Sequence, residues 1–140
     1  MEAKLILYPV LAMFALTLLV AITLIRRRIA FYKGNRVHPQ KTATSAQMAA
    51  VMEDSRAADN FRNLFEVPIL FYVAMLTIFT GGFICMPHLV FAWGFVAARY
   101  VHSAIQCGSN VVMRRFYAYL TSWIFLTCTW LMLAWQLLVG

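Results

Sequence analysis

The stretch RAADNFRNLFEVP, residues 56–68, places two arginines, an aspartate, an asparagine and a glutamate at the start of a long apolar run. Charged side chains beside or within a membrane segment are costly, so they usually persist only where they are paired or used. At about 100° per residue, four of these side chains share one helix face, namely Arg56, Asp59, Asn63 and Glu66. The stretch therefore predicts a polar helix face at the edge of a membrane-embedded bundle. Pairing of Arg62 with Asp59 or Glu66, as a self-neutralised rim, is the alternative interpretation.

The composition of the chain is that of a membrane protein. Of its 140 residues, 63% are hydrophobic and 12% are charged, whereas a soluble domain is about 45–50% apolar and about 25% charged. Four apolar segments are long enough to cross a bilayer, the third only if it accepts Arg99. We predict an all-α integral membrane four-helix bundle forming a single domain over residues 1–140. The expected helices cover residues 5–26, 45–80, 87–107 and 114–139.

Local signals mark the ends of these helices. Thr44 followed by Gln47 fits a capping box at the start of the second helix. The pair at residues 81–82, both glycines, should end that helix, and Pro87 should help to start the third. A turn is expected at residues 108–110, between the third and fourth helices.

Basic residues gather in two of the connections. They are Arg26, Arg27, Arg28, Lys33, Arg36 and Lys41 before the second helix, and Arg114 and Arg115 before the fourth. Basic loops stay in the cytoplasm, so both termini are expected on the non-cytoplasmic side. The compact design, without an evident retention signal, favours a bacterial inner membrane. The net charge of +7 is explained by a rim that faces anionic membrane lipids, without nucleic acid. The three cysteines and three histidines are scattered, which predicts no metal site.

The third helix carries a polar stripe. Arg99, His102 and Gln106 recur at i, i+3 and i+7 on an otherwise apolar segment. Arg99 is too deep to reach the interface easily and therefore needs a carboxylate, for which Glu66 is the expected partner. Alone, His102 is more typical of a packed, hydrogen-bonded histidine than of a catalyst.

The fourth helix opens with a comparable stripe formed by Arg115, Tyr119 and Ser122. On its own, such a stripe is typical of arginine and tyrosine side chains that form a belt at the membrane–water interface. Together, three helices direct basic and hydrogen-bonding side chains to one depth near the cytoplasmic leaflet. This arrangement predicts a pocket for an anionic ligand, since arginines match carboxylates in bidentate fashion, with a lipophilic second ligand supplied by the bilayer.

These residues resemble those of the MAPEG superfamily, the membrane-associated proteins in eicosanoid and glutathione metabolism. The resemblance rests on the four helices, the signature Asn63-x-x-Glu66-x-Pro68, Arg99, and the pair Arg115 and Tyr119, and in layout it spans essentially the whole chain. It implies a homotrimer with glutathione held between adjacent subunits near the cytoplasmic side.

The resemblance also implies roles for individual residues. Those that it assigns to glutathione binding are Arg62, Asn63, Glu66, Arg99, His102 and Tyr119. It assigns to Arg115 the stabilisation of the glutathione thiolate, because a cation beside sulfur lowers the pKa of a thiol.

Two residues depart from the family pattern and argue against glutathione. Asp59 stands where the catalytic branches usually carry an arginine, and Gln106 stands where they carry a tyrosine. The sequence leaves two functions open. One is a glutathione- or thiol-dependent transferase or peroxidase acting on lipophilic substrates. The other is a non-catalytic lipid-binding protein or small accessory subunit of a larger membrane complex, in which buried polar pairs fix helix packing.

Overall fold

A charge-free apolar run forms the first long helix of the computed structural model, which describes residues 2–139. A 3-10 turn, η1 (Ala3–Ile6), leads into α1 (Leu7–Asn35). The helix continues well past the expected end at residue 26, because the arginines after Ile25 are good helix formers once the chain has left the apolar zone. It ends where Arg36 adopts a left-handed conformation, with φ of 50°.

The segment expected as one helix over residues 45–80 contains three helices instead. They are α2 (Ser45–Val51), which follows the short turn η2 (Pro39–Thr42), α3 (Arg56–Asn63) and α4 (Val67–Gly81). The capping box of Thr44 and Gln47 is confirmed, with reciprocal bonds of 3.1 and 3.2 Å. Gly82, with φ of 71°, ends α4 as predicted.

Two local features explain why the segment is interrupted. Between α2 and α3, the Asp54 carboxylate accepts the backbone N–H of Arg56 at 3.3 Å, and such bonds compete with the helical ladder. Between α3 and α4, Pro68 has no N–H, and its ring would collide with the carbonyl of residue 64 in a continuous helix. Residues 64–66 therefore form a turn, and a new helix begins at Val67.

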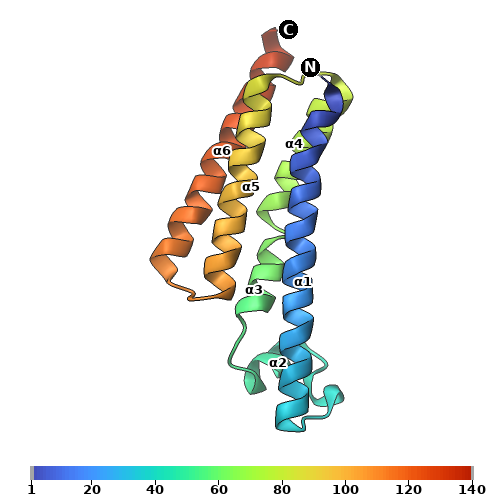
Figure 1. Ribbon diagram of the computed structural model, residues 1–140, viewed down its shortest axis with the longest axis vertical. Helices are drawn as coiled ribbons and strands as arrows, with labels where there is room; N and C mark the ends of the chain where they lie inside the picture. The colour runs from blue at the N-terminus through green and yellow to red at the C-terminus, as the bar shows by residue number, and fades with distance from the viewer. Residues whose placement is uncertain (1, 140) are drawn as a thin grey trace.

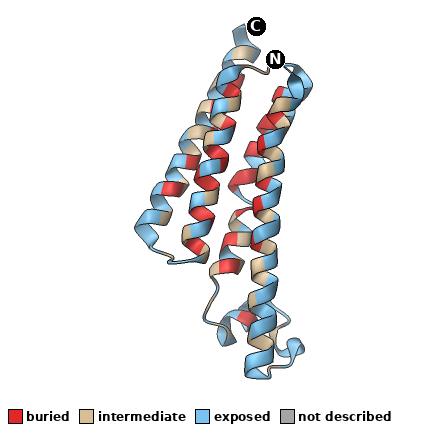
Figure 2. Ribbon diagram, viewed as in Figure 1, coloured by how far each residue is buried: buried red, intermediate tan, exposed pale blue. Residues whose placement is uncertain are grey.

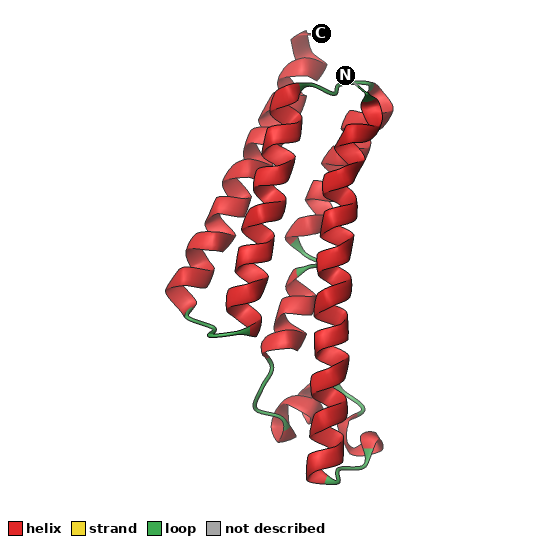
Figure 3. Cartoon of the chain, in the orientation of Figure 1, coloured by secondary structure: helices red, strands yellow, loops and turns green. Residues whose placement is uncertain are grey.

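The last two helices form an antiparallel pair. They are α5 (Met86–Cys107), with Pro87 in its first turn as predicted, and α6 (Val112–Val139). Figure 1 shows the described ends of the chain at one end of the bundle, and α2 beside the far end of α1 at the other. Within residues 2–139 all elements are helical, as expected (Figure 3).

Burial in this bundle follows the pattern of a protein surrounded by lipid. Three stretches are long and apolar enough to cross a membrane: Ala3–Asn35, Arg56–Gly81 and Val112–Val139. Their outward faces expose large apolar side chains, whereas the buried residues line the inward faces (Figure 2). In the core, the ring of Phe71 stacks on Phe95 with centroids 4.5 Å apart.

The helix α5 completes the bundle and carries five of the eight buried polar side chains of the described residues. Arg99, His102, Ser103 and Gln106 are all buried. The inward direction of the predicted stripe on this helix is thus confirmed, and it places polar chemistry inside an otherwise apolar assembly.

Candidate functional site

A cavity of about 250 Å³ lies between the end of α3, the second half of α5 and the start of α6. Its polar lining consists of Asn63, His102, Gln106, Arg115 and Tyr119, and its apolar lining of Val112 and Phe116. Four of the side chains predicted from the sequence to form a site therefore meet here, from three different helices. We call this space the α5–α6 cavity.

Arg99 contacts Asn63 in the wall of this cavity, but it does not line the cavity itself and has no exposed surface. One guanidinium nitrogen, Nη2, donates to the side-chain oxygen of Asn63 and, at 3.5 Å, to the Asn63 carbonyl. The other guanidinium nitrogens, Nε and Nη1, have no hydrogen-bond partner among the described residues. The result is a buried cation held by a neutral amide, with two of its nitrogens unpaired.

The expected clamp between Arg99 and Glu66 does not form. Glu66 is exposed, and its carboxylate is 3.5 Å from the Asn63 side-chain nitrogen. The cause is the break after α3, because Glu66 has non-helical φ and ψ of −99° and −91° and turns away from the bundle. Asn63 thus stands between the arginine and the glutamate and contacts both.

His102 joins α5 to the start of α6. Its Nδ1 lies 3.1 Å from the backbone carbonyl of Arg115, and its Nε2 lies 2.9 Å from the side-chain oxygen of Gln106. Both ring nitrogens are therefore engaged, as the packed-histidine interpretation anticipated. In this arrangement His102 is a positioning residue that holds the first turn of α6 against α5.

Arg115 occupies that first turn. Its Nη1 donates to the side-chain oxygen of Asn110 at 2.7 Å, and Asn110 has a left-handed φ of 51° in the turn after α5. The α6 N-terminus adds the positive end of a helix dipole to the same wall of the cavity. The role of Asn110 was missed from the sequence, although asparagine is a common residue at left-handed turn positions.

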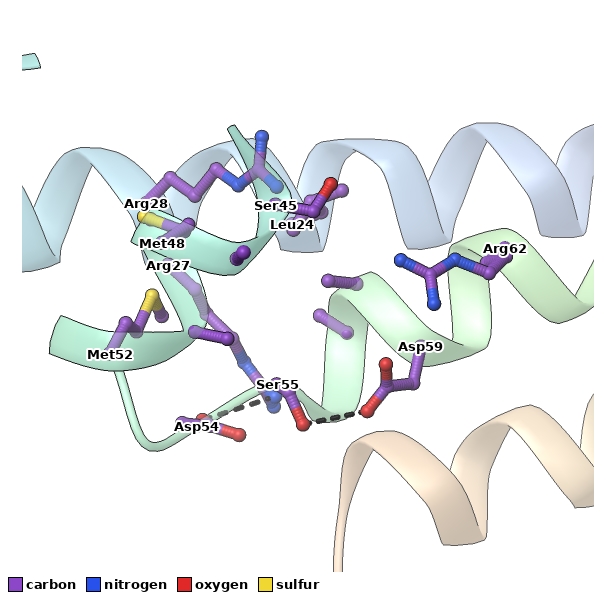
Figure 4. Close-up of a pocket in the computed structure, with 14 residues that line it drawn as sticks. Leu24, Arg27, Arg28, Ser45, Met48, Met52, Asp54, Ser55, Asp59 and Arg62 are labelled. Atoms are coloured by element: carbon purple, nitrogen blue, oxygen red, sulfur yellow. Dashed lines mark hydrogen bonds and ion pairs between the residues drawn. The ribbon is translucent and has the colours of Figure 1, made fainter. Parts of the chain in front are cut away.

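Arg62 and Asp59 line a different cavity. This space, of about 400 Å³, lies between α1, α2 and α3 (Figure 4). The Asp59 carboxylate accepts the hydroxyl of Ser55 at 2.6 Å. The expected pairing of Arg62 with Asp59 or Glu66 is not among the ion pairs of the described residues, where Asp54 instead pairs with Arg27 and Arg56. The negative charge of Asp59 is therefore directed away from the α5–α6 cavity.

The chain matches a known protein family. The model of the MAPEG family matches residues 6–135 of the chain. No curated protein and no solved structure matches it.

Proposed function

The chain belongs to the MAPEG family, a family of four-helix membrane bundles, and on that premise we propose that it binds glutathione in the α5–α6 cavity as the thiol donor of a transferase or peroxidase. The substrates are lipophilic electrophiles or peroxides that reach the cavity from the bilayer. Family membership makes the protein a multi-pass integral membrane protein. The particular ligand and reaction are our proposal.

The observation that supports this proposal most strongly is that the Arg99 guanidinium is buried while two of its nitrogens have no hydrogen-bond partner among the described residues. A buried charge is costly unless it is paired and hydrogen-bonded, yet two nitrogens of this guanidinium have no partner within residues 2–139. Arg99 is not among the residues that line the α5–α6 cavity, so a planar carboxylate of the ligand would pair with this fork once the neighbouring side chains move aside. Glutathione carries two carboxylates, so the donor set fits this ligand.

Asn63 and Arg115 have different tasks in this proposal. Asn63 contacts Arg99 through its oxygen. One of its amide N–H groups faces the Glu66 carboxylate at 3.5 Å, and the other is available for a ligand acceptor. Arg115 is a permanent cation on the opposite helix, where the α6 dipole reinforces it.

Bound glutathione would supply a thiolate, which would form a carbon–sulfur bond with an electrophilic carbon as the leaving group departs with its electron pair. With a peroxide, the thiolate would attack one oxygen and break the O–O bond, releasing an alcohol and leaving a sulfenic acid that a second glutathione would convert to the disulfide and water. Arg115 and the α6 N-terminus would favour the thiolate form by stabilising negative charge at the sulfur. Tyr119 lines the same wall one turn further along α6 and offers a phenolic donor. Val112 and Phe116 give the lipophilic substrate an apolar surface beside these groups.

The proposed setting of the protein follows from the family and from its charge distribution. Members of the family are typically trimers, and we propose a homotrimer in a bacterial inner membrane. The basic connections would face the cytoplasm and both termini the other side. The exposed apolar faces of the helices (Figure 2) would then contact lipid and neighbouring subunits.

A non-catalytic role is the alternative, and Gln106 favours it. This residue contributes an amide where the catalytic branches usually carry a tyrosine, and the amide contacts His102. The protein would then bind a lipid or serve as a small subunit of a larger membrane complex. Retention of glutathione without turnover, or of a partner chain without glutathione, would favour this role.

Titration calorimetry with glutathione, followed by conjugation of chlorodinitrobenzene, tests the proposed function. Arg115→Ala removes the cation that lines the cavity, and Arg114→Ala is the matched control, because Arg114 is exposed and does not line it. We expect saturable binding and conjugation by the wild type and by Arg114→Ala. Conjugation by Arg115→Ala should fall at least about tenfold. Equal activity of the two variants, or no binding at millimolar glutathione, would reject the proposal.

A further inference from the structure

The cavity between α1, α2 and α3 has the makeup of a second binding site, separate from the α5–α6 cavity. We call it the α1–α3 cavity. Its volume of about 400 Å³ is in the range of small-molecule sites. Leu24, Met48 and Met52 supply an apolar wall, and three arginines supply its positive charge: Arg27, Arg28 and Arg62.

Two of these three arginines are not neutralised by the protein. Arg27 contacts Asp54 at 3.4 Å and donates to the carbonyl of Cys107 at 2.6 Å. Arg28 and Arg62 have no ion pair or side-chain hydrogen bond within residues 2–139. Figure 4 shows that they come from different helices, Arg28 from α1 and Arg62 from α3.

The two acidic residues that line the cavity already have partners in the protein. Asp54 pairs with Arg56, with Arg56 Nε 2.8 Å from its carboxylate, as well as with Arg27. The Asp59 carboxylate accepts the hydroxyl of Ser55. An anion that entered beside Arg28 and Arg62 would therefore gain two cationic contacts without displacing an existing ion pair.

The position of the cavity along the bundle identifies the class of anion. From Leu7 to Ile25, α1 is apolar and rises about 28 Å, close to the thickness of the hydrocarbon layer. Arg27 and Arg28 follow directly, and on the other side Arg62 precedes the apolar α4, which begins at Val67. The α1–α3 cavity thus lies at the boundary between hydrocarbon and headgroups, at the end of the bundle away from the termini (Figure 1).

We propose that the α1–α3 cavity binds one anionic phospholipid of the surrounding leaflet. Its phosphate would lie between Arg28 and Arg62, and the upper part of an acyl chain would lie against Leu24, Met48 and Met52. Basic pockets between membrane helices suit anionic headgroups, and methionines adapt to flexible apolar ligands. A lipid held in this way would fix α2 and α3 against α1. This inference does not depend on the thiol chemistry proposed above.

Native mass spectrometry of the protein in non-ionic detergent would test this site. The probes are phosphatidylglycerol, phosphatidylcholine and glycerol phosphate, each added at the same concentration. We expect one phosphatidylglycerol to be retained per chain, with weaker retention of the other two. Glycerol phosphate retained as strongly as the lipid would show that a free phosphate suffices and would overturn the lipid assignment. Equal retention of phosphatidylcholine would overturn the anionic selectivity.

Two pairs of variants distinguish lipid binding in the α1–α3 cavity from lipid binding to a diffuse basic surface. Arg28→Gln should weaken retention of phosphatidylglycerol about fivefold, whereas Arg26→Gln, on the same helix but outside the cavity, should not. Ala49→Trp fills the cavity without altering charge and should abolish retention, whereas Ala50→Trp, equally exposed on α2 but outside the lining, should not. Equal effects within either pair would contradict the proposal.

Discussion

Replacement of Arg99 by methionine should raise the stability of the protein while weakening its affinity for glutathione. Methionine has nearly the volume of arginine, so the cavity term of the substitution is small. The substitution removes a guanidinium that has no exposed surface and whose Nε and Nη1 have no partner in the described chain. A residue kept for packing alone would not show this combination of effects.

The expected size of the change follows from the contacts of this side chain. Each buried nitrogen without a partner costs about 2 kcal/mol, so the two nitrogens together cost about 4 kcal/mol. The charge-assisted hydrogen bond from Arg99 to Asn63 offsets about 2 kcal/mol of this cost. Arg99→Met should therefore raise the free energy of unfolding by about 2 kcal/mol. Loss of a contact to a ligand carboxylate should weaken glutathione binding at least about tenfold.

Unfolding in mixed detergent micelles with increasing dodecyl sulfate, followed by tryptophan fluorescence, measures the first quantity. Calorimetric titration with glutathione measures the second. Arg99→Lys keeps the charge without the planar fork and should bind glutathione with intermediate affinity. Arg114→Met removes an exposed arginine and should change neither quantity. A loss of more than about 2 kcal/mol of stability in Arg99→Met with unaltered glutathione affinity would refute the reasoning, because Arg99 would then be a structural clamp.

Three further predictions concern residues that stabilise the helices around the site. Hydrogen bonds from Arg56 hold the pKa of the Asp54 carboxyl below its ordinary value of 3.8. The pair therefore stabilises the fold at neutral pH, and this stabilisation is lost as the pH falls through the lowered pKa. Asp54→Asn should therefore flatten the acid limb of a plot of unfolding temperature against pH. Asn60 is fully buried and bonded to two side chains of α5, so Asn60→Ala should cost about 2–3 kcal/mol in the same dodecyl sulfate titration. Phe71→Ala removes a ring stacked on Phe95 and should cost about 3–5 kcal/mol.

Much of the fold could be predicted from the sequence because membrane helices are defined by local patterns. The charge-free run of α1, the capping box at Thr44 and the glycine that ends α4 each act within a few residues. The family predicted from the spacing of Asn63, Glu66 and the later arginines is confirmed by the match over residues 6–135. The third and fourth helices begin within two residues of the expected positions.

The interruptions of the second segment were not predicted. Proline is accepted in the first turn of a helix, so Pro68 is compatible both with a helix that starts beside it and with a longer helix that it would kink. The predicted pairing of Arg99 with Glu66 is wrong for the same reason. Glu66 would reach the bundle interior only if the helix continued through Pro68. The family resemblance assigns Arg62, as the basic residue just before Asn63, to glutathione binding, but neighbours on a helix point about 100° apart. Its side chain lines the α1–α3 cavity instead.

The proposal that the protein binds glutathione as a thiolate is tested most directly by the ultraviolet difference spectrum of glutathione bound to the protein. This spectrum reports the fraction of thiolate. We expect a thiolate band for the wild type at neutral pH, retained by Arg114→Ala and lost in Arg115→Ala. The band should titrate below the pH at which free glutathione ionises, because Arg115 and the α6 N-terminus stabilise the anion. Bound glutathione without a thiolate band, or a band that survives in Arg115→Ala, would contradict the account.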